Sequence, residues 1–212
     1  MTKSKPISSL KWLDWAREIQ SLAQIGSTYA ENDFQEERYQ RLMGISAEIV
    51  SEHSNLEVAA VLENFRVQPG YATPKVDVRG AVFRDGKLLM VREKIDGGWT
   101  MPGGWADVND YPAASAEREV WEESGFRVKT RKLIVVYDTN RVEPMEFYHA
   151  YKLLFLCNII SGEATTSNET TDVKFFAEDQ VPKNLAGERT RPRHIRDAFT
   201  AFRNPDILAI FE

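Results

Sequence analysis

The sequence predicts an α/β protein in two parts, a small helical domain followed by a larger domain of mixed strands and helices. In the first part, apolar residues recur at the three-and-four spacing of amphipathic helices. From Val76 the pattern changes to short, strand-like apolar stretches separated by turns. Gly70 and Pro74 interrupt the helical period between the two patterns. We therefore expect a three-helix domain over residues 1–68, a linker over 68–75 and an α/β domain over 76–212.

Each of the three N-terminal helices has its own signal. The first is expected over residues 12–23, with Gly26 as its stop. The second follows from the apolar period between residues 39 and 50. The third begins after Ser54 and Glu57, which form a Ser-x-x-Glu capping pattern.

A helical domain of roughly 70 residues buries too little surface to be robust alone. Trp12, Trp15 and Tyr39 are of the aromatic types enriched at protein interfaces. We expect this domain to form a homodimer and to help shape the substrate pocket. Packing of these aromatic residues within the chain is the alternative.

The second domain opens with two strands, over residues 76–83 and 87–92, joined by an Asp85-Gly86 hairpin turn. A glycine-rich loop follows at 97–104, and Pro112 marks the first turn of a helix that ends before Gly125. The remaining expected elements are three strands and a final helix, over residues 132–138, 147–157, 171–177 and 193–202.

Composition narrows the class of protein. The 212 residues include 27 basic and 32 acidic side chains, a net charge of −5 that makes nucleic acid an unlikely partner. The single cysteine, Cys157, excludes an internal disulfide, and residues 1–10 have no charged-then-apolar leader. The apolar runs are far shorter than the roughly 20 residues that span a bilayer. We expect a cytoplasmic protein with no membrane association.

Three carboxylates fall on one face of the predicted helix over 112–124. Glu119, Glu122 and Glu123 stand at positions i, i+3 and i+4, where like charges oppose one another. A divalent cation such as Mg²⁺, which prefers carboxylate oxygens and substrate phosphate, would compensate them. Arg118 can hold a carboxylate through paired hydrogen bonds. A solvated acidic helix face is the alternative.

The longer spacing resembles a known motif. Gly104, five residues, Asp110, seven residues and then Arg118-Glu119-Val120-x-Glu122-Glu123-x-Gly125-Phe126 are similar to the Nudix box, with Asp110 in place of the usual glutamate. The resemblance covers residues 76 to about 200. It implies a mixed sheet sandwiched between helices, in which the box forms a loop, a helix and a loop.

The resemblance also implies a reaction. Nudix hydrolases cleave a nucleoside diphosphate linked to another group, X, into a nucleoside monophosphate and phosphoryl-X. By similarity, Glu119, Glu122 and Glu123 bind Mg²⁺, for which Mn²⁺ can substitute, the Gly104 carbonyl is a further ligand, and Arg118 orients the glutamates. The general base is one of the box glutamates or an acid from a later loop. Glu169 is the candidate there, and an ordinary loop acid is its alternative reading.

Substrate recognition is expected mainly outside the box. Trp99 and Trp105 flank Gly103-Gly104 of the glycine-rich loop, where an aromatic face can stack on a base or cover the metal site. Arg79 and Arg92 on the first two strands can reach substrate phosphate through bidentate contacts. Loop packing is the alternative for the tryptophans, and surface salt bridges are the alternative for the arginines.

Residues 75–83, 99–108 and 169–173, with the helical N-terminal segment, resemble a bacterial Nudix subgroup described as ADP-ribose or CDP-choline pyrophosphatases. The expected partner is therefore a small nucleoside diphosphate derivative. One rival is a non-catalytic nucleotide-ligand sensor, against which the intact Arg-Glu-x-x-Glu-Glu set argues. The other is an RNA-processing hydrolase that reads RNA through Arg189, Arg191, Arg193 and Arg196.

Overall fold

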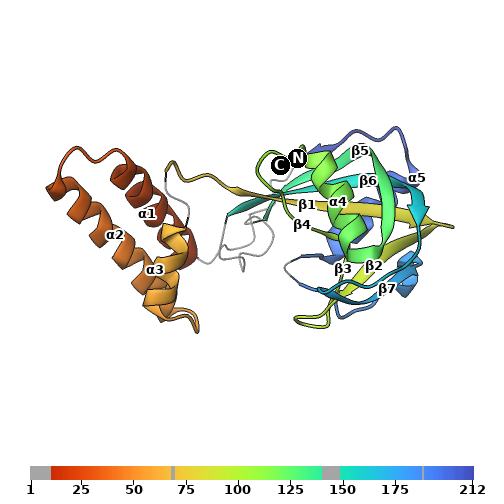
Figure 1. Cartoon of the computed structure of the whole chain (residues 1–212), viewed down its shortest axis with the longest axis horizontal. Helices are drawn as coiled ribbons and strands as arrows, with labels where there is room; N and C mark the ends of the chain where they lie inside the picture. Colours follow the sequence, from red (N-terminus) through yellow and green to blue (C-terminus); the bar gives the residue numbers. More distant parts are fainter. Residues whose placement is uncertain (1–10, 68–69, 140–148, 188) are drawn as a thin grey trace, which may run out of the picture. The chain divides into compact units, whose positions relative to one another are not determined.

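The computed structural model describes residues 11–67, 70–139, 149–187 and 189–212, and they form two compact units (Figure 1). The first unit contains the N-terminal helices and residues 70–74, together with Thr139 and His149. The second contains Lys75–Asp138 and Ala150–Glu212. Its first strand begins at Lys75, inside the expected linker, whose residues 68 and 69 lie outside the described ranges.

Three helices make up the first unit, as the apolar period predicts: α1 (Lys11–Thr28), α2 (Asp33–Glu52) and α3 (Val58–Arg66). They share a small core in which Ala16, Ala47, Val50 and Val61 are buried. The Ser46 hydroxyl in α2 donates a 2.7 Å hydrogen bond to the Ala16 carbonyl in α1. The small side chains of Ala16, Ser46 and Ala47 suit this direct contact between α1 and α2.

Two boundary predictions in this unit are wrong. Helix α1 continues through Gly26 to Thr28, and a Cβ at Gly26 would lie 2.1 Å from the Tyr39 ring. This glycine makes room for an aromatic side chain and does not end the helix. Ser54 does not cap α3, whose N-cap is Glu57 without a side-chain hydrogen bond. The Ser54 hydroxyl instead accepts a hydrogen bond from the Leu56 amide at 3.2 Å.

The aromatic residues expected at an interface are in different environments. Trp12 stacks on His53 with ring centroids 4.7 Å apart, and Tyr39 is partly buried over Gly26. Both therefore pack within their own unit. Trp15 is 58% exposed, and Phe34, at the start of α2, is 74% exposed.

An eight-stranded sheet forms the second unit. Its main path runs β3-β2-β1-β6-β5-β8, while β4 pairs with β1 and β7 pairs with β2. At the centre β1 and β6 are parallel, and β2 and β5 are antiparallel to them. The strands are β1 (Lys75–Arg84), β2 (Lys87–Glu93), β3 (Trp99–Thr100), β4 (Gly103–Trp105), β5 (Phe126–Asp138), β6 (Ala150–Gly162), β7 (Thr170–Phe176) and β8 (Ile210–Phe211).

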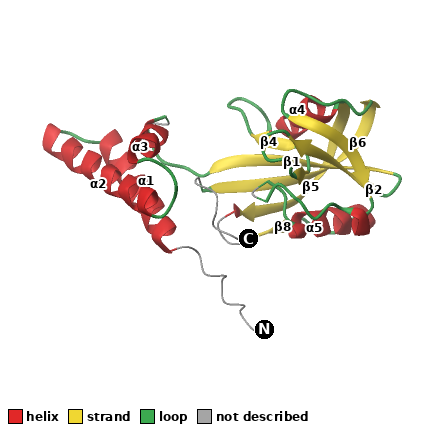
Figure 2. Ribbon diagram, turned by 90° about the horizontal axis from the view of Figure 1, so that it is seen from below, coloured by secondary structure: helices red, strands yellow, loops and turns green. Residues whose placement is uncertain are grey.

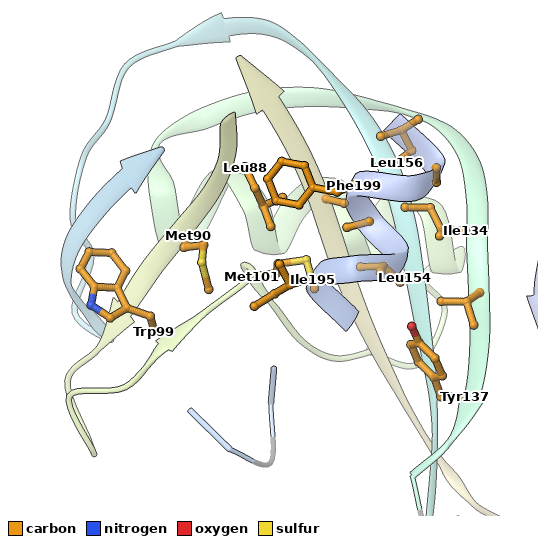
Figure 3. Close-up of a cluster of buried hydrophobic side chains, with 14 residues drawn as sticks. Leu88, Met90, Trp99, Met101, Ile134, Tyr137, Leu154, Leu156, Ile195 and Phe199 are labelled. Carbon is orange, nitrogen blue, oxygen red and sulfur yellow. The ribbon is translucent and has the colours of Figure 1, made fainter. Parts of the chain in front are cut away.

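Two helices cover opposite faces of this sheet, α4 (Pro112–Ser124) and α5 (Pro192–Arg203) (Figure 2). Val120 of α4 belongs to one buried cluster, and Ile195 and Phe199 of α5 belong to the other (Figure 3). The expected sandwich of a mixed sheet between helices is confirmed. Across the described ranges, no helix combines the length and apolar character needed to cross a bilayer.

Local signals account for part of this architecture. Asp85 and Gly86 both have positive φ, 51° and 73°, as the expected two-residue hairpin requires. The glycine-rich loop contains the short strands β3 and β4, which were not expected. Strand β5 is longer than predicted and β8 was missed. The strand expected over 147–157 forms β6, and its predicted start at 147 lies outside the described residues.

Candidate active site

Helix α4 presents the carboxylates because its ends and its inner face are fixed. Pro112 occupies the first turn, and Gly125 ends the helix in the left-handed conformation at φ 77°. Ala116 and Val120 are fully buried against the sheet. The adjoining face of α4 packs against β4, and this face carries Glu119 and Glu123.

Glu123 is the buried carboxylate of the site. Glu123 is 5% exposed, and its Oε2 accepts a 3.0 Å hydrogen bond from the Gly103 amide of β4. Burial raises the pKa of Glu123 to about 8. The charge of Arg79 and the Gly103 amide oppose this shift, whereas the negative charges of Glu93 and Glu119 add to it. The carboxylate therefore lies in a place that favours either a proton or a cation.

Arg118 joins the other acids of the motif. Its guanidinium lies 2.9 Å from Glu119 and 2.9 Å from Glu122, and it also reaches Asp107 at 2.8 Å and Asp110 at 3.3 Å. Arg118 thus contacts two aspartates and two glutamates at once, and its orienting role stays a prediction. Asp110, where the motif usually has glutamate, contacts Arg118.

Glu119 and Gly104 lie close together. A Cβ added to Gly104 would stand 2.9 Å from Glu119 Oε2, so the glycine leaves space that the carboxylate uses. Burial raises the pKa of Glu119, and the neighbouring charge of Glu122 raises it further. Glu122 is more exposed than Glu119, with 47% of its side chain accessible against 13%.

Arg79 does not lie at the surface where a substrate contact was expected. It is 3% exposed and bound to Asp77 by two hydrogen bonds, from Nε to Oδ1 at 3.0 Å and from Nη2 to Oδ2 at 2.9 Å. Nη1 donates to the Met101 carbonyl at 3.3 Å. Arg79 thus acts on Glu119 and Glu123 as a buried positive charge beneath the site.

The two tryptophans of the glycine-rich segment differ. Trp99 is 7% exposed and packs edge-on against Phe176 at 4.9 Å, so it belongs to the core (Figure 3). Trp105 is 47% exposed, with Lys75 Nζ 5.9 Å from its ring centroid. Arg92 is exposed on β2, and its Nε donates to the Gly97 carbonyl at 3.0 Å. Trp105 and Arg92 remain accessible to a ligand.

Sequence reasoning missed Glu93, a buried acid at the end of β2. It raises the pKa of Glu123 and pairs with Arg189 at 3.5 Å. Glu169 is brought to the same place, because its carbonyl accepts a 2.8 Å hydrogen bond from the Lys94 amide. The strand pattern around Glu93 gave no functional signal, since its pairing with Arg189 spans 96 positions of sequence.

The donor chemistry of the site fits a divalent cation. Within the described ranges, no three Asp, Glu, His or Cys side chains already form a metal-binding group. Arg118 lies between Glu119 and Glu122 and compensates their charge. The carboxylate oxygens are nevertheless the donors that Mg²⁺ prefers. Burial is the main cause of the raised pKa values of Glu119 and Glu123, and the charge of a neighbouring glutamate adds to each, so a bound cation would stabilise the ionised carboxylates.

The basic cluster near α5 is engaged in internal contacts. Arg193 pairs with Glu212 at 2.8 Å and lies over the Tyr137 ring, and Arg196 pairs with Asp197 at 3.3 Å. Arg189 contacts acids near β2. These contacts give no support to the RNA-binding alternative.

Comparisons with known proteins agree with this geometry. Residues 10–65 match a family model described as a UDP-X-like N-terminal oligomerisation domain, and residues 73–199 match the NUDIX domain. The Bacillus subtilis protein YjhB, provisionally named an ADP-ribose pyrophosphatase, is 36% identical over 203 residues, which cover 95% of this chain and 97% of that protein.

Solved structures give the same assignment. A UDP-X diphosphatase has 28% identity and a TM-score of 0.62, with coverage of 97% of this chain and 100% of that one. An ADP-ribose pyrophosphatase from Streptococcus suis has 31% identity and a TM-score of 0.61, with coverage of 66% and 100%. The chain therefore belongs to the Nudix hydrolase family.

Proposed function

We propose that this Nudix hydrolase is a cytoplasmic, Mg²⁺-dependent enzyme that cleaves the pyrophosphate of a nucleoside diphosphate linked to X. The products are a nucleoside monophosphate and phosphoryl-X. The observation that carries the proposal is the set of carboxylates on α4, Glu119, Glu122 and Glu123, beside Arg118 and the Gly103–Gly104 strand. A solvated helix face does not explain a glutamate that is 5% exposed and bound to a backbone amide.

Glu119, Glu122 and Glu123, with the Gly104 carbonyl, would hold the cation, and Mn²⁺ is expected to substitute for Mg²⁺. When bound, a divalent cation neutralises pyrophosphate oxygens and lowers the pKa of a coordinated water. Arg118 keeps Glu119 and Glu122 side by side.

The remaining groups position the acids and handle the proton. The Gly103 amide fixes the orientation of Glu123, and the buried Arg79 moderates its pKa. The proton of the attacking water passes to a carboxylate, either a glutamate of α4 or Glu169. Glu169 is a reasonable candidate because its backbone is tied to Lys94, next to Glu93.

Names of similar proteins suggest the substrate class. ADP-ribose is named for YjhB and for the Streptococcus suis structure, and UDP-X for the other structure. We propose ADP-ribose, UDP-X compounds and CDP-choline as the leading substrates. Trp105 and Arg92 are accessible, so we assign them to base stacking and phosphate contact respectively.

A product-resolved screen tests this function. The purified chain is incubated with ADP-ribose, UDP-glucose and CDP-choline, with Mg²⁺ or with EDTA, and products are separated by chromatography. We expect a nucleoside monophosphate and phosphoryl-X from at least one substrate, only with the cation. Lack of hydrolysis across the panel would favour the sensor alternative, which binding of the same compounds would then reveal.

We also propose that the N-terminal unit forms a homodimer. The matched family model describes an oligomerisation domain. In this unit Trp15, Leu22 and Phe34 are each more than half exposed, which is unfavourable for large apolar side chains in water. A second copy of the same surface would cover them.

A further inference from the structure

The segment Arg189–Thr190 is fixed by three hydrogen bonds from buried groups. The Thr190 hydroxyl lies 2.8 Å from the Thr100 hydroxyl and accepts a 3.0 Å hydrogen bond from the Met101 amide. The Lys152 ammonium donates a 2.9 Å hydrogen bond to the Arg189 carbonyl. The backbone at Arg189 is therefore held against β3 and β6.

Lys152 is an unusual anchor because it is 2% exposed. Burying an ammonium costs free energy unless a counter-charge and hydrogen bonds compensate. Asp77 lies 4.0 Å from Nζ, and the same carboxylate binds Arg79. The structure thus uses a buried charge network to hold the main chain of Arg189.

The Arg189 side chain contacts two acids at and just after the end of β2. Nε is 3.5 Å from Glu93 Oε1, and Nη1 is 3.0 Å from Asp96 Oδ2. Its side chain is 33% exposed, whereas that of Arg79 is 4% exposed. The Glu93 contact is long compared with the paired bonds of about 3 Å that lock Arg79 on Asp77.

We propose that Arg189 contacts a phosphate oxygen of the substrate, and that Lys152 and Thr190 are the positioning residues that present it. In the free enzyme Arg189 neutralises Glu93, and on substrate binding it exchanges this contact for phosphate. The inference rests on the proposed pyrophosphate hydrolysis. It adds to the contact proposed for Arg92 a second phosphate contact, from Arg189 and not from Arg79, because Arg79 is buried and already paired with Asp77.

The exchange is chemically reasonable. A guanidinium presents a fork of N–H groups that matches phosphate oxygens, and Nη2 is not used in the contacts with Glu93 and Asp96. When a substrate phosphate takes the place of Glu93 beside the Arg189 guanidinium, one anionic partner is exchanged for another. At 3.5 Å the Glu93 contact holds the guanidinium less firmly than the paired bonds hold Arg79, so Arg189 is freer to turn toward a phosphate.

Binding of methylenediphosphonate, a pyrophosphate analogue that resists hydrolysis, tests the proposal without turnover. Isothermal titration calorimetry with Mg²⁺ compares the intact chain with Arg189→Ala, Arg189→Lys and the control Arg196→Ala. Arg196 is an exposed arginine on α5 whose partner is its neighbour Asp197. We expect Kd to rise roughly 10- to 100-fold in Arg189→Ala, less in Arg189→Lys, and under about twofold in the control.

An unchanged Kd in Arg189→Ala, or no binding by the wild type, would overturn the proposal. Failure of the proposed function would look different. In that case the wild-type chain would bind methylenediphosphonate through Arg189 but hydrolyse no nucleoside diphosphate derivative.

The positioning role needs a second test, because Lys152→Met leaves Asp77 with one cation fewer and can impair folding. Thr190→Val keeps the side-chain shape and removes both hydroxyl contacts. We expect Thr190→Val to weaken methylenediphosphonate binding when Arg189 is present and to have no added effect when it is combined with Arg189→Ala. Equal effects in the two backgrounds would show that Thr190 does not act through Arg189.

Discussion

The Gly103 amide donates a 3.0 Å hydrogen bond to Glu123 Oε2, which ties the glycine-rich strand β4 to the carboxylate helix α4. Gly103 adopts φ 148°, and a Cβ there would lie 2.1 Å from the Val78 carbonyl oxygen. Only glycine fits this position without a shift of the backbone. The Gly103-Gly104 pair therefore serves the site in two ways, since Gly104 leaves space for Glu119.

Gly104→Ala tests that second role. The new methyl group would press on Glu119 Oε2 at 2.9 Å, a flexible carboxylate end, and would displace it. We expect kcat/KM to fall roughly 10- to 100-fold, with little change in the melting temperature. Gly187→Ala is the control, since a Cβ there meets nothing within 4 Å. Equal activity in the two variants would show that the Glu119 position is not important.

Asp110→Glu restores the usual residue of the motif. Asp110 contacts Arg118 at 3.3 Å at the partly exposed edge of the site, and a longer acid can keep this contact. We expect a change in kcat of less than about threefold, because the contact is a partly exposed ion pair. Steady-state kinetics would measure it. A large gain would show that Asp110 is a shortened metal ligand.

His194 makes stability depend on pH. It is 6% exposed, and burial lowers its pKa well below the ordinary value, with the charge of Lys152 adding to the shift. Because the unfolded chain binds the proton more readily, this contribution to stability is present above about pH 6.5 and is lost as pH falls through the folded-state pKa.

Thermal unfolding between pH 7.5 and 5.5 measures this effect. In the wild type the Arg191 amide donates a 3.2 Å hydrogen bond to Nδ1 of His194. In His194→Asn the side-chain oxygen can accept this bond, but the side chain does not titrate. The melting temperature of the variant should fall less on acidification than that of the wild type. Parallel curves for the two proteins would assign the acid sensitivity to other groups.

The oligomer proposal makes a matched prediction. Light scattering with size-exclusion chromatography should give a dimer for the intact chain and a monomer for Trp15→Asp. Trp15 is 58% exposed in the first unit. Ile160→Asp, at a residue 65% exposed in the second unit, should remain dimeric. A monomeric wild type would instead leave the function of the N-terminal helices open to the sensor alternative.

The sequence predicts the elements whose signals are local. The helix around Glu119 has proline in its first turn and glycine after its end, and the hairpin at Asp85 has the residues that its turn requires. Strand β8 was missed because it is two residues long and forms by pairing with β5, far away in sequence.

The site was predictable only where its residues share one helix. Glu119, Glu122 and Glu123 are related by helical spacing, so their common face follows from sequence. The burial of Arg79 depends on its pairing with Asp77. Trp99 is buried in the core by packing against Phe176 of β7. Such tertiary contacts override the general tendency of arginine to be exposed.

The most direct test of the account is the hydrolysis rate of Glu123→Gln with the best substrate of the screen, in Mg²⁺. Glu117→Gln is the control, since Glu117 lies on the same helix but binds the Thr130 amide at 2.7 Å, away from the site. If the α4 carboxylates hold the catalytic cation, kcat falls roughly 100-fold or more in Glu123→Gln and stays near wild type in Glu117→Gln, with both variants folded by circular dichroism. Wild-type kcat in Glu123→Gln would contradict the assignment of the active site.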